Sequence, residues 1–478
     1  YIMVVQHNMQ AANANRMLNV TTSAQSKSTE KLSSGYRINR AADDAAGLTI
    51  SEKMRKQIKG LDRASTNAED GVSAVQTAEG ALTEVHSMLQ RMNELATQSA
   101  NGTNSNTDRK AIQDEIDQLT TEIDRVSETT KFNETYLLKG DGAEKEHNVN
   151  AHDAGLDGVT LTDKGDSVEV ALKELKGGDK ISIAGKNYTI GGEEDDVTKL
   201  LTDAGVTAKD GAKVTINGTE YTYYTKASDD ATVTLDHAGF FATQPTKANK
   251  TANADYTLDT IKSAKGVTIS AGGKSVKTID ADANGVDKKD SSIITAKKAY
   301  MLETAEVLKA SGIGADKAPT ATGNDALNTA TNKFTLTKGK VSYNDALSFN
   351  LHVGADADMT NKIAVNIDSM NSAGLGVKGI KADTEQDATY AIDAIADAIS
   401  TVSSQRSALG AVQNRLEHTI NNLDNVVENT TSAESRIRDT DMAEEMVNYS
   451  KNNILAQAGQ SMLAQANQSN QGVLSLLQ

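Results

Sequence analysis

Apolar residues recur at every seventh position in Met54-RKQIKG-Leu61-DRASTN-Ala68-EDGVSA-Val75-QTAEGA-Leu82-TEVHSM-Leu89-QRMNEL-Ala96. A sustained period of seven buries a narrow stripe between packed helices. We therefore predict a helix from about residue 47 to residue 100, which would be roughly 80 Å long at about 1.5 Å per residue. Its apolar stripe needs partners from elsewhere in the chain.

Two further segments carry the same spacing and supply those partners. The first has apolar residues at Ile112, Ile116, Leu119, Ile123 and Val126. The second comes from the far end of the chain and contains Ile392, Ile395, Ile399, Val402, Leu409, Leu416, Ile420, Leu423 and Val427. The predicted fold is mixed but mainly α, with a long antiparallel helical bundle or coiled coil built from both termini. The middle of the chain must then loop out from the tip of this bundle.

Both ends of the chain, residues 3–45 and 440–478, have weaker helical patterns. The C-terminal end has one stripe of Met446, Ile454, Leu455, Ala458, Met462, Leu463 and Ala466, followed by Val473, Leu474, Leu476 and Leu477. Isolated helices of this kind gain their stability from packing rather than from propensity. We predict that both ends are unpaired and weakly ordered in the free chain, and that they fold together on a partner.

The junctions between these segments also have sequence signals. Gly35 and residues 41–47 predict a joint, and Asn101-Gly102 predicts a left-handed C-cap before a helix that Asp108 opens. Near the C-terminus, charged residues cluster at Arg436, Arg438, Asp439 and Asp441. We expect this cluster to pair with residues 37–44 across the joint.

The composition changes between residues 140 and 345, where Gly, Asp, Lys and Thr rise and the apolar period drops to two. The segment Lys180-ISIAGKNY-Thr189 is echoed by Lys213-VTINGTEY-Thr222, and both predict β-hairpins with Ala-Gly or Asn-Gly turns. A weaker third copy lies at 267–273, and a short helix is expected at 195–204. These signals predict a β-rich, α+β central variable insert with room for two subdomains. A further hairpin, 347–353 with 362–367, is expected to pack on the bundle.

Composition excludes several classes of function. The net charge of −16 argues against a nucleic-acid footprint. The chain has no cysteine, so packing or partners must hold it together. The sequence contains no run of 18 apolar residues, so it predicts no membrane span. The N-terminus lacks the pattern of a Sec-type signal peptide, so we expect any export to use another route.

Motifs for enzymatic chemistry or metal binding fail on their details. Asp280-ADAN-Gly285 resembles the start of an EF-hand loop, but Ser291 stands where the twelfth-position Glu is needed. No His-Glu-x-x-His motif occurs, and His147 with His152 lacks helical metal spacing. We predict no catalytic, metal-binding or cofactor-binding residues, and therefore no enzyme.

Four segments give the chain a family resemblance. Ser33-SGYRINRAADDAAG-Leu48 resembles the N-terminal signature of bacterial flagellins, and Ser403-SQRSALGAVQNRL-Glu417 resembles their C-terminal bundle helix. Ala433-ESRIRDT-Asp441 and Met462-LAQA-Asn467 extend the match. The resemblance covers roughly 3–139 and 346–478, a little over half of the chain. In many flagellins the segment like 349–355 closely follows the second bundle helix, so here the insert is expected to leave the bundle before that hairpin.

The resemblance implies a subunit that polymerises into the flagellar filament for motility. Residues 1–45 and 438–478 would form the two halves of an inner-tube helical domain. Residues 46–139 and 346–437 would form the core bundle domain, and 140–345 would be displayed on the surface. The implied partners are other copies of the chain, a flagellar export chaperone, and the filament cap and hook-junction proteins. The implied route is type III export, which places the chain outside the cell.

Two sets of site residues follow from this reading. The assembly helices would use Leu18, Leu32, Ile454, Leu455, Met462, Leu463, Leu474 and Leu477. A second set should point away from the buried ladder: Gln90, Arg91, Glu94, Leu95, Gln98 and, on the neighbouring helix, Glu115. We interpret this patch as a subunit contact within the filament, and it also resembles the flagellin patch recognised by Toll-like receptor 5.

Two alternatives remain open from the sequence. A hook–filament junction protein shares terminal bundles, but not the long Ser403–Glu417 match or so large an insert. A host-receptor ligand or adhesin would place its binding function in residues 140–345. Deletion of the insert separates the readings, because a filament subunit should still polymerise without it.

Overall fold

The computed structural model describes residues 8–327 and 332–476 of the 478-residue chain. These residues form two compact units. The first contains the described residues up to 76, residues 349–365 and the described residues from 410 on; the second contains residues 77–348 and 366–409 apart from the gap. Two long helices, α2 (Ala45–Ser99) and α7 (Glu385–Arg438), contribute to both units.

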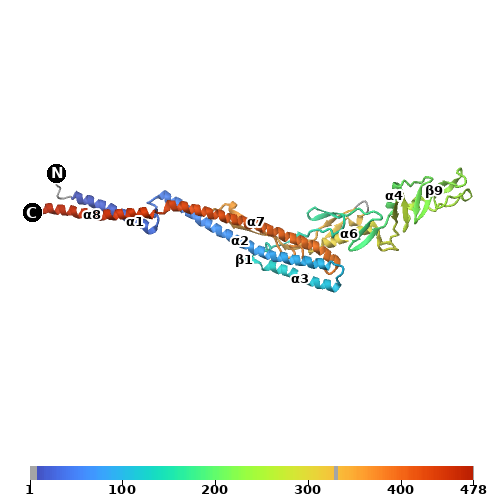
Figure 1. Ribbon diagram of the computed structural model, residues 1–478, viewed down its shortest axis with the longest axis horizontal. Coiled ribbons are helices and arrows are strands. Elements are labelled where there is room, and N and C mark those ends of the chain that lie inside the picture. The colour runs from blue at the N-terminus through green and yellow to red at the C-terminus, as the bar shows by residue number, and fades with distance from the viewer. Residues whose placement is uncertain (1–7, 328–331, 477–478) are drawn as a thin grey trace. The chain divides into compact units, whose positions relative to one another are not determined.

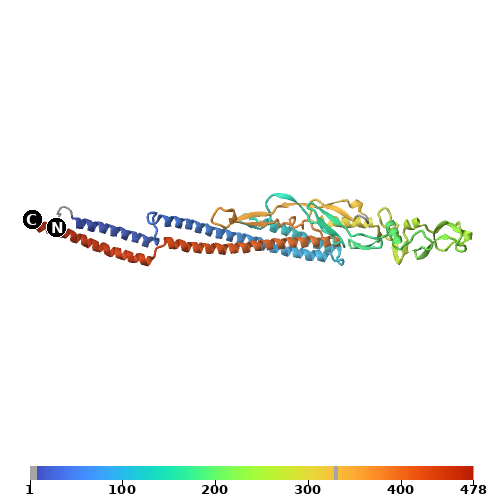
Figure 2. The same cartoon turned by 90° about the horizontal axis from the view of Figure 1, so that it is seen from above.

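In the first unit, the terminal helices α1 (Met9–Ser34) and α8 (Met442–Leu476) lie side by side (Figure 1 and Figure 2). The hairpin β17 (Leu347–His352) and β18 (Lys362–Ile367) packs against the two long helices of this unit, with the short helix η3 (Met359–Asn361) near its tip. Ala68 of α2, Leu416 of α7 and Ile363 of β18 share one buried cluster. Gly71 permits this approach, because a Cβ there would lie 2.2 Å from Cδ1 of Leu351. The predicted packing of the hairpin on the bundle is confirmed.

In the second unit, α3 (Asn106–Thr129) begins at a capping box, where Ser105 and Asp108 exchange hydrogen bonds. Most of the predicted ladder residues of this unit are buried, including Leu82, Leu89, Ile116, Ile123, Ile395 and Val402, whereas Leu119, Val126, Ile392 and Ile399 are half-buried. The predicted left-handed cap of α2 is wrong, because neither Asn101 nor Gly102 has a positive φ. The buried Arg109 guanidinium instead donates to the carbonyls of Ser99, Asn101 and Asn104 at 2.9–3.0 Å. It thereby satisfies carbonyls at a helix end that would otherwise lack partners.

The insert leaves the bundle region through paired strands. After the short hairpin β1 (Lys131–Phe132) and β2 (Thr135–Tyr136), β3 (Glu144–Asn148) pairs antiparallel with β16 (Lys340–Asn344). The chain therefore returns before β17 begins. This agrees with the expectation that the insert departs before the hairpin.

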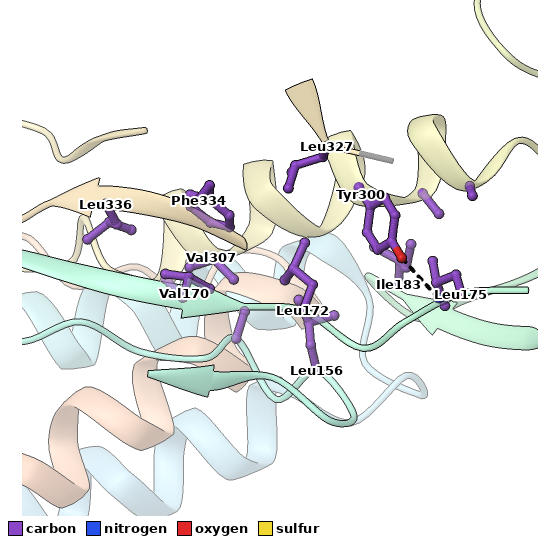
Figure 3. Packing of buried hydrophobic residues seen from close by; sticks show 14 of the residues in the cluster. Leu156, Val170, Leu172, Leu175, Ile183, Tyr300, Val307, Leu327, Phe334 and Leu336 are labelled. Carbon is purple, nitrogen blue, oxygen red and sulfur yellow. Dashed lines mark hydrogen bonds between the residues drawn. The ribbon is translucent and has the colours of Figure 1, made fainter. Parts of the chain in front are cut away.

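Residues 149–190 and 293–337 form what we call the basal subdomain, apart from the gap at 328–331. It has a four-stranded antiparallel sheet, in the order β14 (Thr320–Thr322), β15 (Lys333–Thr337), β5 (Ser167–Ala171) and β4 (Thr160–Asp163). A three-stranded sheet has the order β13 (Ile293–Ile294), β7 (Lys186–Ile190) and β6 (Lys180–Ile183). The helix α6 (Ala296–Ala310), followed by η2 (Asn324–Ala326), packs on these strands through Tyr300 and Val307 (Figure 3).

Residues 193–277 form the nested subdomain, which is inserted between β7 and β13. Its five-stranded sheet has the order β10 (Thr234–Phe241), β9 (Thr219–Lys226), β8 (Lys213–Ile216), β11 (Thr268–Ala271) and β12 (Lys274–Lys277). The helices α4 (Glu194–Asp203) and α5 (Leu258–Lys262) and the turn η1 (Lys247–Asn249) complete it. Val197, Phe240 and Ile269 belong to its separate core.

The three hairpin predictions are confirmed by their turns. Ala184-Gly185 and Asn217-Gly218 both have positive φ at each residue, as a two-residue type I′ turn requires. Gly272-Gly273 closes the third hairpin in the same way. The echo in sequence does not produce stacked repeats, however. The first hairpin lies in the basal subdomain, and the other two pair with each other through β8 and β11.

The two subdomains are joined by a narrow neck, where the chain passes outward at Gly192 and returns at 277–279. Gly192 donates its N–H to the carbonyl of Lys277 at 2.8 Å and accepts from Ile279 at 3.1 Å. The two segments run parallel, with Gly192 opposite Thr278. Glycine is needed because a Cβ at 192 would lie 2.1 Å from Cγ1 of Val276.

Candidate assembly interface

The terminal helices α1 and α8 form an antiparallel pair. Asn8 caps α1 by accepting the N–H of Ala11 at 2.9 Å, and its side-chain amide donates to the carbonyl of Ala466 near the end of α8. At the other end of α1, Lys31 lies 3.7 Å from Glu445, which is near the start of α8. The prediction of unpaired terminal helices therefore differs from this structure, in which each covers one face of the other. The contacts between them explain why sequence periodicity missed the pairing.

The most buried side chains in the seam between α1 and α8 are small or polar, namely Ser28, Glu445 and Ala456. Gly459 lets the helices approach, since a Cβ there would lie 3.3 Å from Cδ1 of Leu18. Leu18, Leu32 and Leu463 lie half-buried along the seam. This interface buries little apolar area, so the hydrophobic effect stabilises the isolated pair only weakly.

Several large apolar residues of these helices face away from the seam. We call Val447, Ile454, Leu455, Ala458 and Met462 the outer apolar face of α8. Val447 and Ile454 are 68% and 67% exposed, and Met17 and Val20 of α1 are each 60% exposed. Full burial of one such side chain contributes about 1.5–3 kcal/mol, so covering this surface could supply on the order of 10 kcal/mol for each copy.

The predicted assembly residues thus divide between two surfaces. Ile454, Leu455 and Met462 lie on the outer apolar face, whereas Leu18, Leu32 and Leu463 lie in the seam. Leu477 and the side chain of Leu474 lie outside the described residues. Val447 was missed because it lies beside the predicted stripe. Its spacing of seven from Ile454 was the signal that could have found it.

The joint between the terminal pair and the long helices is held mainly by backbone groups. Gly35 ends α1 in the left-handed conformation with φ of 76°. Arg37 donates its backbone N–H to the carbonyl of Arg438 at 2.6 Å, and its guanidinium donates to the carbonyl of Ile437 at 2.7 Å. The expected pairing of the charged cluster with residues 37–44 is therefore confirmed for Arg438, through its backbone carbonyl. The side chain of Arg438 pairs instead with Glu52 of α2 at 2.7 Å, and this hydrogen bond lowers the pKa of Glu52.

Asp441, the last charged residue of the cluster, caps the helix that follows it. The Asp441 carboxylate accepts the N–H groups of Ala443 and Glu444 at the start of α8. Carboxylates at this position satisfy free amides and favour the positive end of the helix dipole. The joint thus combines helix capping with backbone pairing of the two chain ends.

The second predicted patch lies where α2 and α3 meet in the second unit. Arg91 donates from Nε to Glu115 of α3 at 2.9 Å and from Nη1 to Glu94 at 3.2 Å, and these bonds raise the pKa of Arg91. Gln90 and Gln98 are also exposed. Five of the six predicted residues therefore form one polar surface.

Leu95 is the exception, and its predicted outward orientation is wrong. Its side chain is only 2% exposed. Ala81 and Met88, fourteen and seven residues earlier, are half-buried, so they form a second stripe beside the main ladder. A helix covered on two sides needs a wider apolar arc than a two-helix seam does.

Metal-binding and membrane-spanning features are absent from the part of the chain that the structure describes. No group of three or more His, Asp or Glu side chains in that part could hold a metal ion. In the EF-hand-like segment, the Asp282 carboxylate accepts backbone N–H groups from Asn284 and Val286. Among the described helices, none has the length and apolar character of a membrane crossing.

Comparison with known proteins shows the family. Residues 5–143 match the bacterial flagellin N-terminal helical region, and residues 392–477 match the bacterial flagellin C-terminal helical region. A flagellin from Clostridium tyrobutyricum is 40% identical over 475 residues, covering 98% of this chain and 100% of that protein. A flagellin from Bacillus subtilis is 35% identical, with 99% and 100% covered. The chain belongs to the bacterial flagellins.

Its function follows from that membership. The protein is a structural subunit of the bacterial flagellar filament and not an enzyme. Among solved structures, FliC from Burkholderia pseudomallei is 18% identical with a TM-score of 0.26, covering 72% of this chain and 99% of that one.

Proposed function

We propose that the subunit polymerises by burying the outer apolar face of α8, together with Met17 and Val20 of α1, against the terminal helices of neighbouring copies. The observation that carries the proposal is that this face stays exposed although α8 already has a helical partner. A second copy offers both the apolar face and the matching helix. Because the contact is heterologous and does not close, repeating it gives a filament rather than a ring.

Seeded polymerisation tests this proposal. Purified chain is mixed with short filament fragments and viewed by electron microscopy, beside a variant that lacks residues 442–478. The full chain should extend the seeds and the truncated chain should not.

Point variants exclude a general effect of losing a helix. Ile454→Ser should slow extension strongly, whereas Gln460→Ala, an exposed polar position off the apolar face, should not. Equal extension by the Ile454→Ser variant and the unaltered chain would remove the outer apolar face from the assembly mechanism.

We also propose that the subunit is secreted through the flagellar type III route, with an export chaperone and the filament cap and hook-junction proteins as partners. A filament subunit must reach the outside of the cell before it can assemble. The test measures the chain in the culture medium of cells with and without a working export apparatus. Continued secretion without the apparatus would contradict the proposal.

For the polar patch of Gln90, Arg91, Glu94, Gln98 and Glu115, we propose two uses. It contacts another subunit in the filament, and Toll-like receptor 5 recognises it on the free monomer. The support is its exposure and the fixed position of Arg91 between two carboxylates. Arg91→Ala should weaken binding of monomer to the receptor ectodomain. Arg125→Ala is the matched control, since Arg125 pairs with Glu122 on α3 outside the patch.

A further inference from the structure

Glu303 is an exception among the buried polar residues of the basal subdomain. It lies on α6 between Tyr300 and Val307 and is fully buried. Neither of its carboxylate oxygens has a hydrogen-bond partner among the described residues. A buried carboxylate without a partner is strongly disfavoured in its charged form. This position therefore favours a neutral carboxyl group.

The neighbouring polar groups of α6 are satisfied. The hydroxyl oxygen of Tyr300 accepts the N–H of Leu175 at 2.9 Å, as Figure 3 shows. Thr304 donates its hydroxyl to the carbonyl of Tyr300 at 2.8 Å. Glu303 thus differs from the residues beside it, although all three face the same core.

The charges around α6 do not compensate this carboxyl group. Burial raises the pKa of Glu303 to about 7, and the charge of Lys173 opposes the shift only in part. Lys173 is itself paired with Asp157 at 2.7 Å. Of the strands packed against α6, β6 contributes only the exposed Lys180 and β14 contributes no titratable residue. Glu169 of β5 and Lys333 of β15 pair with each other at 3.4 Å. The hydroxyl of Tyr300 interacts with Glu303 and also with Glu174 and Asp179, and none of these groups carries a positive charge.

The same helix also fastens the basal subdomain to α7. Glu306, three residues after Glu303, accepts the hydroxyl of Tyr390 at 2.6 Å. Lys309 pairs with Asp387 at 2.7 Å. Tyr390 belongs to the same buried cluster as Tyr300 and Val307. A displacement of α6 would therefore disturb both the core of the subdomain and its attachment to α7.

We propose that Glu303 is a proton-controlled lock on α6, which holds the basal subdomain closed while the carboxyl group is neutral and loosens it when the group ionises. Ionisation draws the central turn of α6 toward water, because a charged carboxylate gains hydration there. The strands packed against α6 then become exposed to solvent. The contacts of Glu306 and Lys309 with α7 weaken at the same time. Alkaline conditions then open the displayed part of the subunit without a change in the terminal helices.

Amide hydrogen exchange on the full-length monomer tests the lock. Protection of β5, β15 and α6 is measured from about pH 5 to about pH 9, after correction for the intrinsic pH dependence of exchange. The local opening constant should rise by about two powers of ten across this range. In Glu303→Gln and Glu303→Met it should stay nearly constant with pH, because neither side chain can ionise.

Glu220→Gln, at an exposed carboxylate of the nested subdomain, should keep the pH dependence of the unaltered chain. The infrared carbonyl band of a protonated carboxylic acid should be present at about pH 6 and absent in Glu303→Gln. If the Gln and Met variants retain the same pH-dependent opening, or if this band is missing, Glu303 is not the lock.

Discussion

The terminal helix pair and the basal subdomain treat apolar surface in opposite ways. The pair α1 and α8 buries small and polar residues most deeply in its seam and leaves Val447 and Ile454 exposed to water. The basal subdomain buries Tyr300, Phe334 and Leu336, and even encloses the carboxyl group of Glu303. In the proposed filament, other copies would cover the first region, whereas the second completes its core within one chain. On this proposal, polymerisation and folding of the insert draw on separate sources of stability.

The largest expected effect breaks the assembly side of this comparison. Replacing Ile454 and Met462 together by Asp places charges on the outer apolar face and should abolish filament formation at any practical concentration, because burying unpaired charges is prohibitive. Sedimentation and electron microscopy measure the loss. The unfolding transition of the insert should be unchanged, and a matching loss of insert stability would contradict the separation of the two regions.

The reverse experiment destabilises the insert and leaves the terminal helices unchanged. Phe334→Ala should destabilise the basal subdomain by about 3–5 kcal/mol, since it leaves a cavity in a closed core. Chemical denaturation measures the change, and seeded filaments should still extend. Met359→Ala is the control, because that apolar side chain is 75% exposed and its loss should change stability by less than about 0.5 kcal/mol.

The pH dependence of stability sharpens the comparison further. Glu303 keeps its proton in the folded chain up to a pKa of about 7, against 4.5 in the unfolded chain. The folded state therefore binds more protons in this window, and stability must fall as pH rises from 4.5 to about 7. The loss should be about 3 kcal/mol and then level off. Chemical denaturation at several pH values in this range measures the loss as the free energy of unfolding of the unaltered chain minus that of the Glu303→Gln variant. If this difference increases as pH rises, the predicted sign is wrong.

The smallest effect concerns the turns that close the nested subdomain. Gly218 has φ of +86°, so Gly218→Ala should cost about 1 kcal/mol through backbone strain. Gly80 lies inside α2, and a Cβ added there would meet no atom within 4 Å, so Gly80→Ala should stabilise the helix by about 0.5–1 kcal/mol. Thermal unfolding of the two variants measures both changes in stability. Stabilisation by both substitutions would mean that the turn tolerates alanine.

Local signals predicted the elements well. The heptads of α2, α3 and α7 could be predicted because a narrow buried stripe produces a fixed apolar period. The hairpin turns could be predicted because Asn-Gly and Ala-Gly place glycine in a two-residue turn that requires positive φ. Leu95 was misplaced because a second packing partner widens the buried arc beyond one ladder. The role of Arg109 at the end of α2 was not predicted, since its three carbonyl partners are brought together only by tertiary structure.

The candidate assembly surface was harder to predict from the sequence than the fold. One stripe on the C-terminal segment contained both seam and outer-face residues, and only the position of α1 separates Leu463 from Met462. Glu303 gave no signal, because a glutamate within a helical segment is normally solvated. Its significance depends on its complete burial.

The neck at Gly192 has a consequence for engineering. The chain leaves and re-enters the basal subdomain on neighbouring parallel segments, so the two cut ends lie about 5 Å apart, the ordinary spacing of paired strands. Any foreign domain whose own termini meet at that spacing could replace residues 193–277 without stretching its host. An antigen or enzyme grafted there would be carried once by every subunit, and filament length would set its dose.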